Sequence, residues 1–193
     1  GNFKMDNLKT EEDQDIYGLK LIGGDLTSSL KHINITISIF GEIPSGNAIS
    51  RDGAQPNDLL FTTGLLGLSK IGLDNILLKS NVFHDAKKKY LIPQPRVDLG
   101  ISLRKIATSM IDISDGLVQD ANHLAVNSNL TLQLNVCDLP LPVCSSLTSD
   151  QILNAALYGG DEYELLFSCD SVHESYLKEL SKYPELLKKK SFF

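Results

Sequence analysis

Residues 110–117 carry the side chains of this sequence that are best suited to chemistry. Two carboxylates, Asp112 and Asp115, flank the hydroxyl of Ser114, and Gly116 follows them. Hard cations take oxygen ligands of this kind, and phosphates bind favourably at helix N-termini. A helix cap would account for Asp115 but would leave Asp112 unexplained. We therefore favour a cation and phosphate site over a purely structural role for this string.

These side chains require a strand that runs directly into a helix. From Met110 to Ser114 polar and apolar residues alternate, with Ile111 and Ile113 on the face opposite the polar ones. The apolar positions that follow have helical spacing: Leu117, Ala121, Leu124 and Ala125. The pattern predicts that a strand ends and a helix begins here, with the N-cap among residues 114–116.

Two further acidic stretches follow paired glycines. Asp25 ends the string Gly-Gly-Asp at 23–25, and residues 159–164 read Gly-Gly-Asp-Glu-Tyr-Glu. Paired glycines allow a ligand to approach the backbone closely, and a neighbouring acid can bind a cation that bridges phosphates. A solvated turn is the alternative for both stretches, and taken alone the first string favours a turn.

Residues 51–67 offer another possible phosphate contact. The planar guanidinium of Arg51 suits a phosphate, although an ion pair with Asp52 would explain it equally well. Residues 59–63 are expected to form a buried strand, and a glycine-containing turn leads into a helix expected to end near Leu78. A strand, a glycine turn and a helix start fit a phosphate cradle, but the lysine of a P-loop is missing.

Composition narrows the class of protein. The chain has 193 residues, of which 42% are hydrophobic, and a net charge of −6. An acidic balance argues against a general nucleic-acid binder, and no apolar run is long enough for a membrane span. The three cysteines form no C-x-x-C pair, which favours a reducing compartment, so we expect a cytoplasmic protein.

The remaining elements follow from hydrophobic periodicity. Further strands are expected at 19–22, 33–39, 130–136 and 165–167. Further helices are expected near 99–106, at 150–158 with Ser149 or Asp150 as the cap, and at 172–180. The lysine run 87–89 is expected to be a solvated face. A boundary at Pro44-Ser45-Gly46-Asn47 divides the chain into residues 1–44 and 45–193.

The chain resembles thiamine-monophosphate kinases, a family of the wider group that includes aminoimidazole ribonucleotide synthetase. The resemblance spans roughly residues 16–180 and rests on five motifs in the family's order. They are Leu-Ile-Gly-Gly-Asp (21–25), Arg-Asp-Gly-Ala-x-Pro-x-Asp (51–58), Thr-Gly-x-x-Gly (63–67), Ile-Asp-Ile-Ser-Asp-Gly-Leu (111–117) and Gly-Gly-Asp-Glu-Tyr-Glu-Leu (159–165).

The resemblance implies an α+β fold and a kinase reaction. Residues 45–193 would form a domain with a mixed β-sheet flanked by helices, and residues 1–44 would be a remnant of an ATP-binding domain. The reaction would be ATP-dependent phosphorylation of thiamine monophosphate to thiamine diphosphate, by direct in-line transfer with magnesium. Full-length members of the family are expected to form homodimers.

The resemblance also implies roles for single residues. Asp25, Asp112 and Asp115 would be Mg²⁺ ligands, and the last two would belong to the catalytic centre. Gly24, Asp25, Arg51 and Ser114 would contact ATP, and Asp161 would contact the substrate.

Three departures from the family bear on activity. The family's N-terminal portion is missing before residue 1, and Asp161-Glu162 replaces the family's usual Glu-Asp. The chain also stops before the C-terminal segment that carries the family's substrate-packing aromatic, and we do not assign that role to Phe192 or Phe193. We therefore expect weak or no turnover from this chain alone.

Two alternatives remain open. One is a non-catalytic module that binds a nucleotide, or a partner through the unpaired strand at 33–39. The other is a related ATP-using enzyme that acts on a different phosphate or carbonyl oxygen.

Overall fold

The first of two structural units is an extended segment with one short helix. The structure is a computed structural model that describes residues 10–25, 27–28, 31–80, 82–180 and 191–192. Its contacts divide the chain into Gly1–Glu42 and Ile43–Phe193. In the first unit, α1 (Thr10–Tyr17) is followed by exposed backbone. The strands predicted at 19–22 and 33–39 are wrong, because the described residues of this unit offer no neighbouring strand to pair with.

The second unit is built on a four-stranded sheet with the order β2-β3-β1-β4. Its strands are β1 (Leu59–Thr62), β2 (Ala107–Asp112), β3 (Leu165–Cys169) and β4 (Ser191–Phe192). All described pairings are antiparallel, where a mixed sheet was expected. The predicted α+β class and the flanking helices are confirmed. The tail lysines and Phe193 lie outside the described residues.

Alternating side chains of the strands are buried on both faces of the sheet. Leu60, Ile111 and Leu166 face a core shared with α5 (Leu117–Asn127) and α6 (Ser149–Tyr158). The opposite face has its own core, made by Leu59, Phe61, Leu103, Phe167, Cys169 and Leu177. The rings of Phe61 and Phe167 stack there at 5.7 Å. The sheet is therefore a rigid platform for the turns at its ends.

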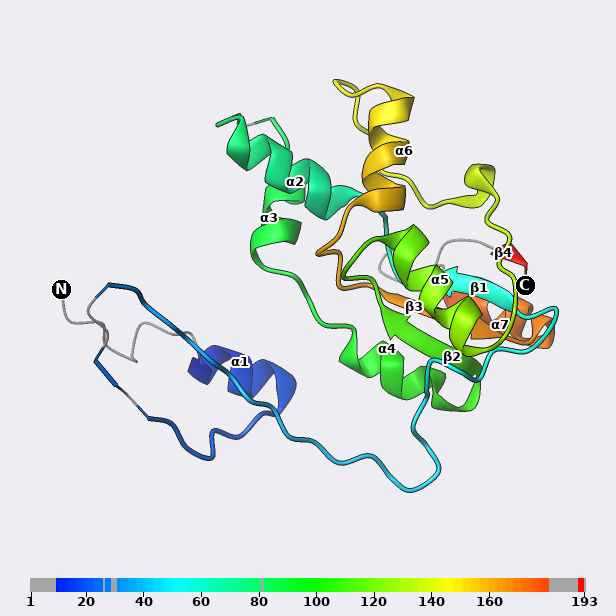
Figure 1. Cartoon of the computed structure of the whole chain (residues 1–193), viewed down its shortest axis with the longest axis horizontal. Helices are drawn as coiled ribbons and strands as arrows, with labels where there is room; N and C mark the ends of the chain where they lie inside the picture. The colour runs from blue at the N-terminus through cyan, green and yellow to red at the C-terminus, as the bar shows by residue number, and fades with distance from the viewer. Residues whose placement is uncertain (1–9, 26, 29–30, 81, 181–190, 193) are drawn as a thin grey trace. The chain divides into compact units, whose positions relative to one another are not determined.

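A second layer of helices lies beyond one end of the sheet (Figure 1). It consists of α2 (Leu68–Leu77), α3 (His84–Leu91) and α6, which meet at Ile71, Ala86 and Ala155. Gly72 makes this approach possible, because a Cβ there would lie 2.1 Å from the carbonyl oxygen of Ala86. Within the described residues, no helix combines the length and apolar character needed to cross a membrane.

The predicted helices are largely confirmed, with corrections at their ends. The inward positions predicted for α5 and α6 are buried. The N-cap of α6 is Thr148, which forms a capping box with Gln151, and not Ser149 or Asp150. The helix expected near 99–106 is α4 (Val97–Ser102) followed by a 3₁₀ turn, Leu103–Lys105.

Two predictions in the second half of the chain, the strand at 130–136 and the helix at 172–180, differ from the structure in how their residues pack. Residues 130–136 form no strand: they contain a single bridge residue and lead into a 3₁₀ turn, Val136–Asp138. Their alternation reflects Leu132 and Leu134, which pack against the core without pairing. The last helix is α7 (Glu174–Leu180), but its core residue is Leu177, whereas Tyr176 is exposed.

Candidate functional site

The two acidic motifs share one backbone network because β2 and β3 pair. The pairing reaches Asp112 and continues beyond the strands. The N–H of Tyr163 donates to the carbonyl of Ile113 at 2.8 Å, and the N–H of Asp161 donates to the carbonyl of Ser114 at 2.9 Å. Motifs that lie almost 50 residues apart in the sequence are thereby held side by side.

Glycines allow this close approach. We call residues 159–164 the acidic turn. A Cβ on Gly160 would lie 2.4 Å from the carbonyl oxygen of Ser114, a distance that real Cβ contacts do not show. Gly116 has a φ of 111°, and a Cβ there would lie 3.1 Å from the backbone of Tyr158. These glycines therefore serve to bring the two motifs together.

The acidic turn divides its side chains between inside and outside. Glu162 and Glu164 are each 1% exposed, whereas Tyr163 is exposed and Asp161 is half-buried. Asp161 and Tyr163 have φ values of 60° and 51°, in the left-handed region that side chains rarely adopt. Such backbone persists only where the surrounding contacts enforce it, and it clusters at functional sites. Nothing in the sequence pattern indicates which of these acids turn inward.

Glu162 fills the N-terminus of α2. Its Oε1 accepts the N–H of Ser69 at 2.9 Å, and the backbone of Gly67 also stabilises the carboxylate. Its Oε2 is buried without a hydrogen bond among the described groups. Burial raises the pKa of Glu162 to about 7, against the opposing effects of these N–H groups and of Lys89. The phosphate cradle predicted here is therefore wrong, because the protein's own carboxylate occupies it.

Glu164 is held by two cations. The fork of Arg96 donates from Nε and Nη2 to its two oxygens at 2.8 and 2.9 Å, and Lys89 forms a second ion pair. The hydroxyl of Thr63 donates to Oε2 at 2.6 Å. The reading of residues 87–89 as a solvated face is therefore wrong for Lys89, whose side chain is 14% exposed.

Asp120 is the structural acid that the sequence analysis missed. Its buried Oδ2 accepts the N–H groups of Ser114, Asp115 and Gly116 at 3.0, 3.0 and 3.1 Å. Burial raises the pKa of Asp120, while these hydrogen bonds act to lower it. The N-cap of α5 is Gly116, within the predicted residues 114–116, but it has no side chain to cap with. The carboxylate that satisfies the N–H groups before the helix belongs to Asp120, in its first turns, and not to Asp115, which is exposed. The sequence feature that could have identified this role is an acid four residues after Gly116, within the first turns of the predicted helix.

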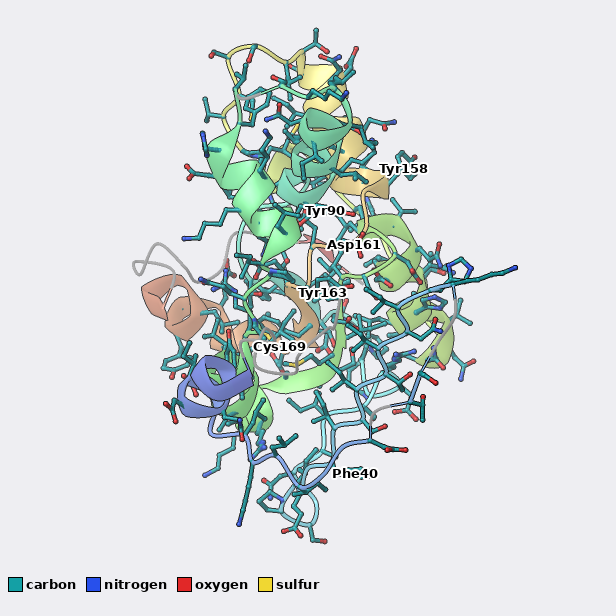
Figure 2. The ribbon with its side chains drawn as sticks, turned by 90° about the vertical axis from the view of Figure 1, so that its left-hand side faces the viewer. Phe40, Tyr90, Tyr158, Asp161, Tyr163 and Cys169 are labelled. Atoms are coloured by element: carbon teal, nitrogen blue, oxygen red, sulfur yellow. The ribbon has the colours of Figure 1, made fainter. Side chains whose placement is uncertain are left out.

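The outward-facing acids of the two motifs are Asp112, Asp115 and Asp161. Among the described residues, none of the three has a cation within ion-pair distance. The hydroxyl of Tyr163 donates to Asp161 at 3.1 Å. This hydrogen bond raises the pKa of Tyr163, and burial and the negative charges of Asp161 and Asp112 raise it further. Figure 2 shows Asp161 and Tyr163 as neighbours along the acidic turn. Carboxylates gathered without described cations suit a divalent cation.

An open pocket of about 450 Å³ is lined by one of these carboxylates, Asp112. Its apolar walls come from Pro93, Pro95, Val97 and Leu165, and Asp112 and Tyr163 also line it. An apolar pocket with a few polar groups at one edge is the usual form of a small-molecule site.

The structure places the other predicted contacts elsewhere on the chain. Gly24 and Asp25 lie in the first unit on exposed backbone. Arg51 is exposed, and Ser50, not Arg51, is the described partner of Asp52. The carbonyl of Arg51 accepts the hydroxyl of Ser128 at the C-terminal end of α5, about 16 Å from the end that carries Asp115.

Comparisons with known proteins support the resemblance seen in the motifs. No family model matches the chain. A thiamine-monophosphate kinase of Buchnera aphidicola (subspecies Schizaphis graminum) is 38% identical over 182 residues, which are 90% of this chain and 54% of the relative. The chain spans about half the length of the curated relatives it matches.

Solved structures of the same enzyme share the fold. The thiamine-monophosphate kinase of Stenotrophomonas maltophilia K279a matches with a TM-score of 0.74 and 30% identity, over 78% of this chain and 51% of that one. A structure described as AaThiL complexed with AMPPCP and TMP matches with a TM-score of 0.64 and 30% identity. The match covers 75% of this chain and 47% of that one. The predicted resemblance to thiamine-monophosphate kinases and the predicted fold class are thereby confirmed.

Proposed function

From this resemblance to thiamine-monophosphate kinases, which extends over 90% of the chain, we propose that the protein takes part in ATP-dependent phosphorylation of thiamine monophosphate to thiamine diphosphate. The observation that carries the proposal is the pairing of the two acidic motifs, which gathers Asp112, Asp115 and Asp161 at one end of the sheet. The complex of a related structure with AMPPCP and TMP supports both substrates.

The residues present fit magnesium. Mg²⁺ takes oxygen ligands and is usually bound through one or two carboxylates together with substrate phosphates. Asp112 and Asp115 are exposed carboxylates without a described cation, and they would hold the ion. The resemblance assigns Asp25 to metal binding as well. The bound ion would neutralise the charge of the phosphates during transfer.

The other residues would position the substrates. The accepting atom is a phosphate oxygen that is already anionic, so no strong general base is required and positioning dominates the chemistry. Ser114 would contact the ATP phosphates, a role that the resemblance also gives to Gly24 and to Arg51, whose backbone lies at the other end of α5. Asp161 would attract the cationic thiazolium ring of the substrate, which the apolar pocket beside Tyr163 suits in character.

The proposal is tested by calorimetric titration of the chain with thiamine monophosphate, with Mg²⁺ and a non-hydrolysable ATP analogue present, and by chromatography of thiamine diphosphate after incubation with ATP. We expect binding that Asp112→Asn weakens at least tenfold and that Asp150→Asn, an equally exposed acid in the first turn of α6, leaves unchanged. If the unaltered chain neither binds the substrate nor forms product, the proposal is wrong.

A partner-binding role has one observation in its favour. Ile33, Ile37, Ile39 and Phe40 of the first unit are between 72% and 81% exposed, and apolar side chains gathered this densely usually mark an interaction surface. The homodimer expected from the resemblance would bury them. Light scattering over a range of concentrations measures this, and Ile37→Asp should shift the chain toward the monomer. A cytoplasmic location, where ATP is available, is part of the same proposal.

A further inference from the structure

We propose that Glu164 is a positioning residue that holds both walls of the substrate pocket in place through its ion pairs with Arg96 and Lys89. This inference rests on the proposed function, because it assigns the pocket to the thiamine substrate. None of these three residues belongs to the set of predicted contacts with ATP, metal or substrate.

One wall of the pocket is the acidic turn. Glu164 lies next to Tyr163, which lines the pocket, and its carboxylate is drawn inward. A Cβ on Gly64 would lie 2.8 Å from Oε1 of this carboxylate, so the fit around it is close. The left-handed φ of Tyr163 shows that contacts elsewhere enforce this conformation.

The opposite wall is the connection between α3 and α4. Pro93, Pro95 and Val97 supply its apolar surface. Lys89, in the last turn of α3, precedes this wall, whereas Arg96, the N-cap residue of α4, is part of the wall and lines the pocket itself. Both bind the same carboxylate. Glu164 therefore joins three elements, and the width of the pocket depends on one buried cluster of charges.

The chain contains a matched control pair. Lys70 and Asp74 form an ion pair within α2, but their side chains are 41% and 48% exposed and neither lines this pocket. An exposed pair at i,i+4 contributes little to structure. Glu164→Gln should therefore alter the pocket and Asp74→Asn should not, although each substitution removes one carboxylate charge from an ion pair.

The test combines amide hydrogen exchange with titration of thiamine monophosphate. In Glu164→Gln we expect exchange to accelerate at least tenfold at the N–H groups of Ile92 and Gly100, on the α3–α4 side, and at those of Asp161 and Tyr163, in the acidic turn. The dissociation constant for thiamine monophosphate should rise at least tenfold. Asp74→Asn should change neither quantity.

Two further variants separate positioning from plain loss of stability. Arg96→Lys keeps the charge but loses the two-point fork, so its effects should be intermediate. Leu177→Ala removes a buried side chain from the core on the far face of the sheet and should destabilise the fold without changing substrate affinity. Its effect on affinity must be much smaller than that of Glu164→Gln.

The outcomes decide between the two proposals. Faster exchange on only one of the two sides, or unchanged substrate affinity when both sides loosen, would overturn the positioning role. A loss of affinity in Leu177→Ala as large as in Glu164→Gln would also overturn it. If the unaltered chain does not bind thiamine monophosphate, the proposed function fails, while the exchange data still decide whether Glu164 holds both sides.

Discussion

The protonation of Glu162 should make the stability of the fold depend on pH in an unusual direction. Most carboxylates in proteins have lowered pKa values and lose stabilising interactions in acid. Burial raises the pKa of Glu162 from 4.5 to about 7. Between these two values the folded chain binds more protons at this site than the unfolded chain does. The contribution of Glu162 is therefore most favourable below about pH 4.5 and is lost as the pH rises through about 7.

The magnitude follows from the shift. A pKa difference of about 2.5 units corresponds to about 3 kcal/mol, and about 2.5 kcal/mol of this lies between about pH 5 and pH 8. Glu162→Gln removes the titration, while its amide oxygen can still accept the N–H of Ser69. The variant should match the unaltered chain near pH 5 and exceed its stability near pH 8.

Urea unfolding at several pH values between about 5 and 8 measures this difference as a free energy of unfolding. Subtracting the variant from the unaltered chain removes the contributions to stability that the two chains share. Asp150→Asn serves as a charge-matched control at an exposed carboxylate. The reasoning is refuted if the difference for Glu162→Gln does not change with pH, or if the variant is less stable at pH 8.

Three further substitutions test the framework of the site through the free energy of unfolding. Glu164→Gln leaves two poorly exposed cations without their carboxylate and should lower the free energy of unfolding by about 3 kcal/mol. Asp74→Asn, in an exposed ion pair, should change it by no more than about 0.5 kcal/mol. Equal losses in the two variants would contradict the distinction between a buried and an exposed ion pair. Asp120→Ala leaves three backbone N–H groups without their acceptor and should cost about 2 to 4 kcal/mol, more than Asp115→Ala at the exposed neighbour. Gly160→Ala should cost more than about 2 kcal/mol, because the new methyl group would overlap the carbonyl of Ser114, and a neutral result would mean that the turn moves freely.

Periodicity predicted the elements that are both regular and packed on the core. The alternation over 110–114 correctly placed Ile111 and Ile113 in the core and Asp112 on the opposite face, where the second core extends along β2 only as far as Met110. The helical spacing from Leu117 onward also identified the buried face of α5. The alternation at 33–39 failed, because a period of two shows which side chains share a face but not whether a neighbouring strand exists.

Which of the acids are buried and paired, and which face outward, could not be predicted from the sequence. Asp161, Glu162 and Glu164 are chemically similar neighbours in the sequence, and each has a different environment in the structure. What distinguishes them is long-range: the N-terminus of α2 lies over Glu162, and two cations contributed some 70 residues earlier surround Glu164. The motifs singled out these acids, but only the fold shows which of their carboxylates are buried and which face outward.

The strand order has a consequence for how the chain is made. β3 is the partner of both β1 and β2, yet it is the third of these strands to be synthesised. Thr63, at the end of β1, and Glu164, at the start of β3, are 101 residues apart. At about 5 to 20 residues per second, β1 would wait about 5 to 20 s for its neighbour on the ribosome. β1 lacks this partner throughout that interval and β2 lacks it for about the second half, so a growing chain that ends before residue 165 should depend on chaperones far more than the finished one.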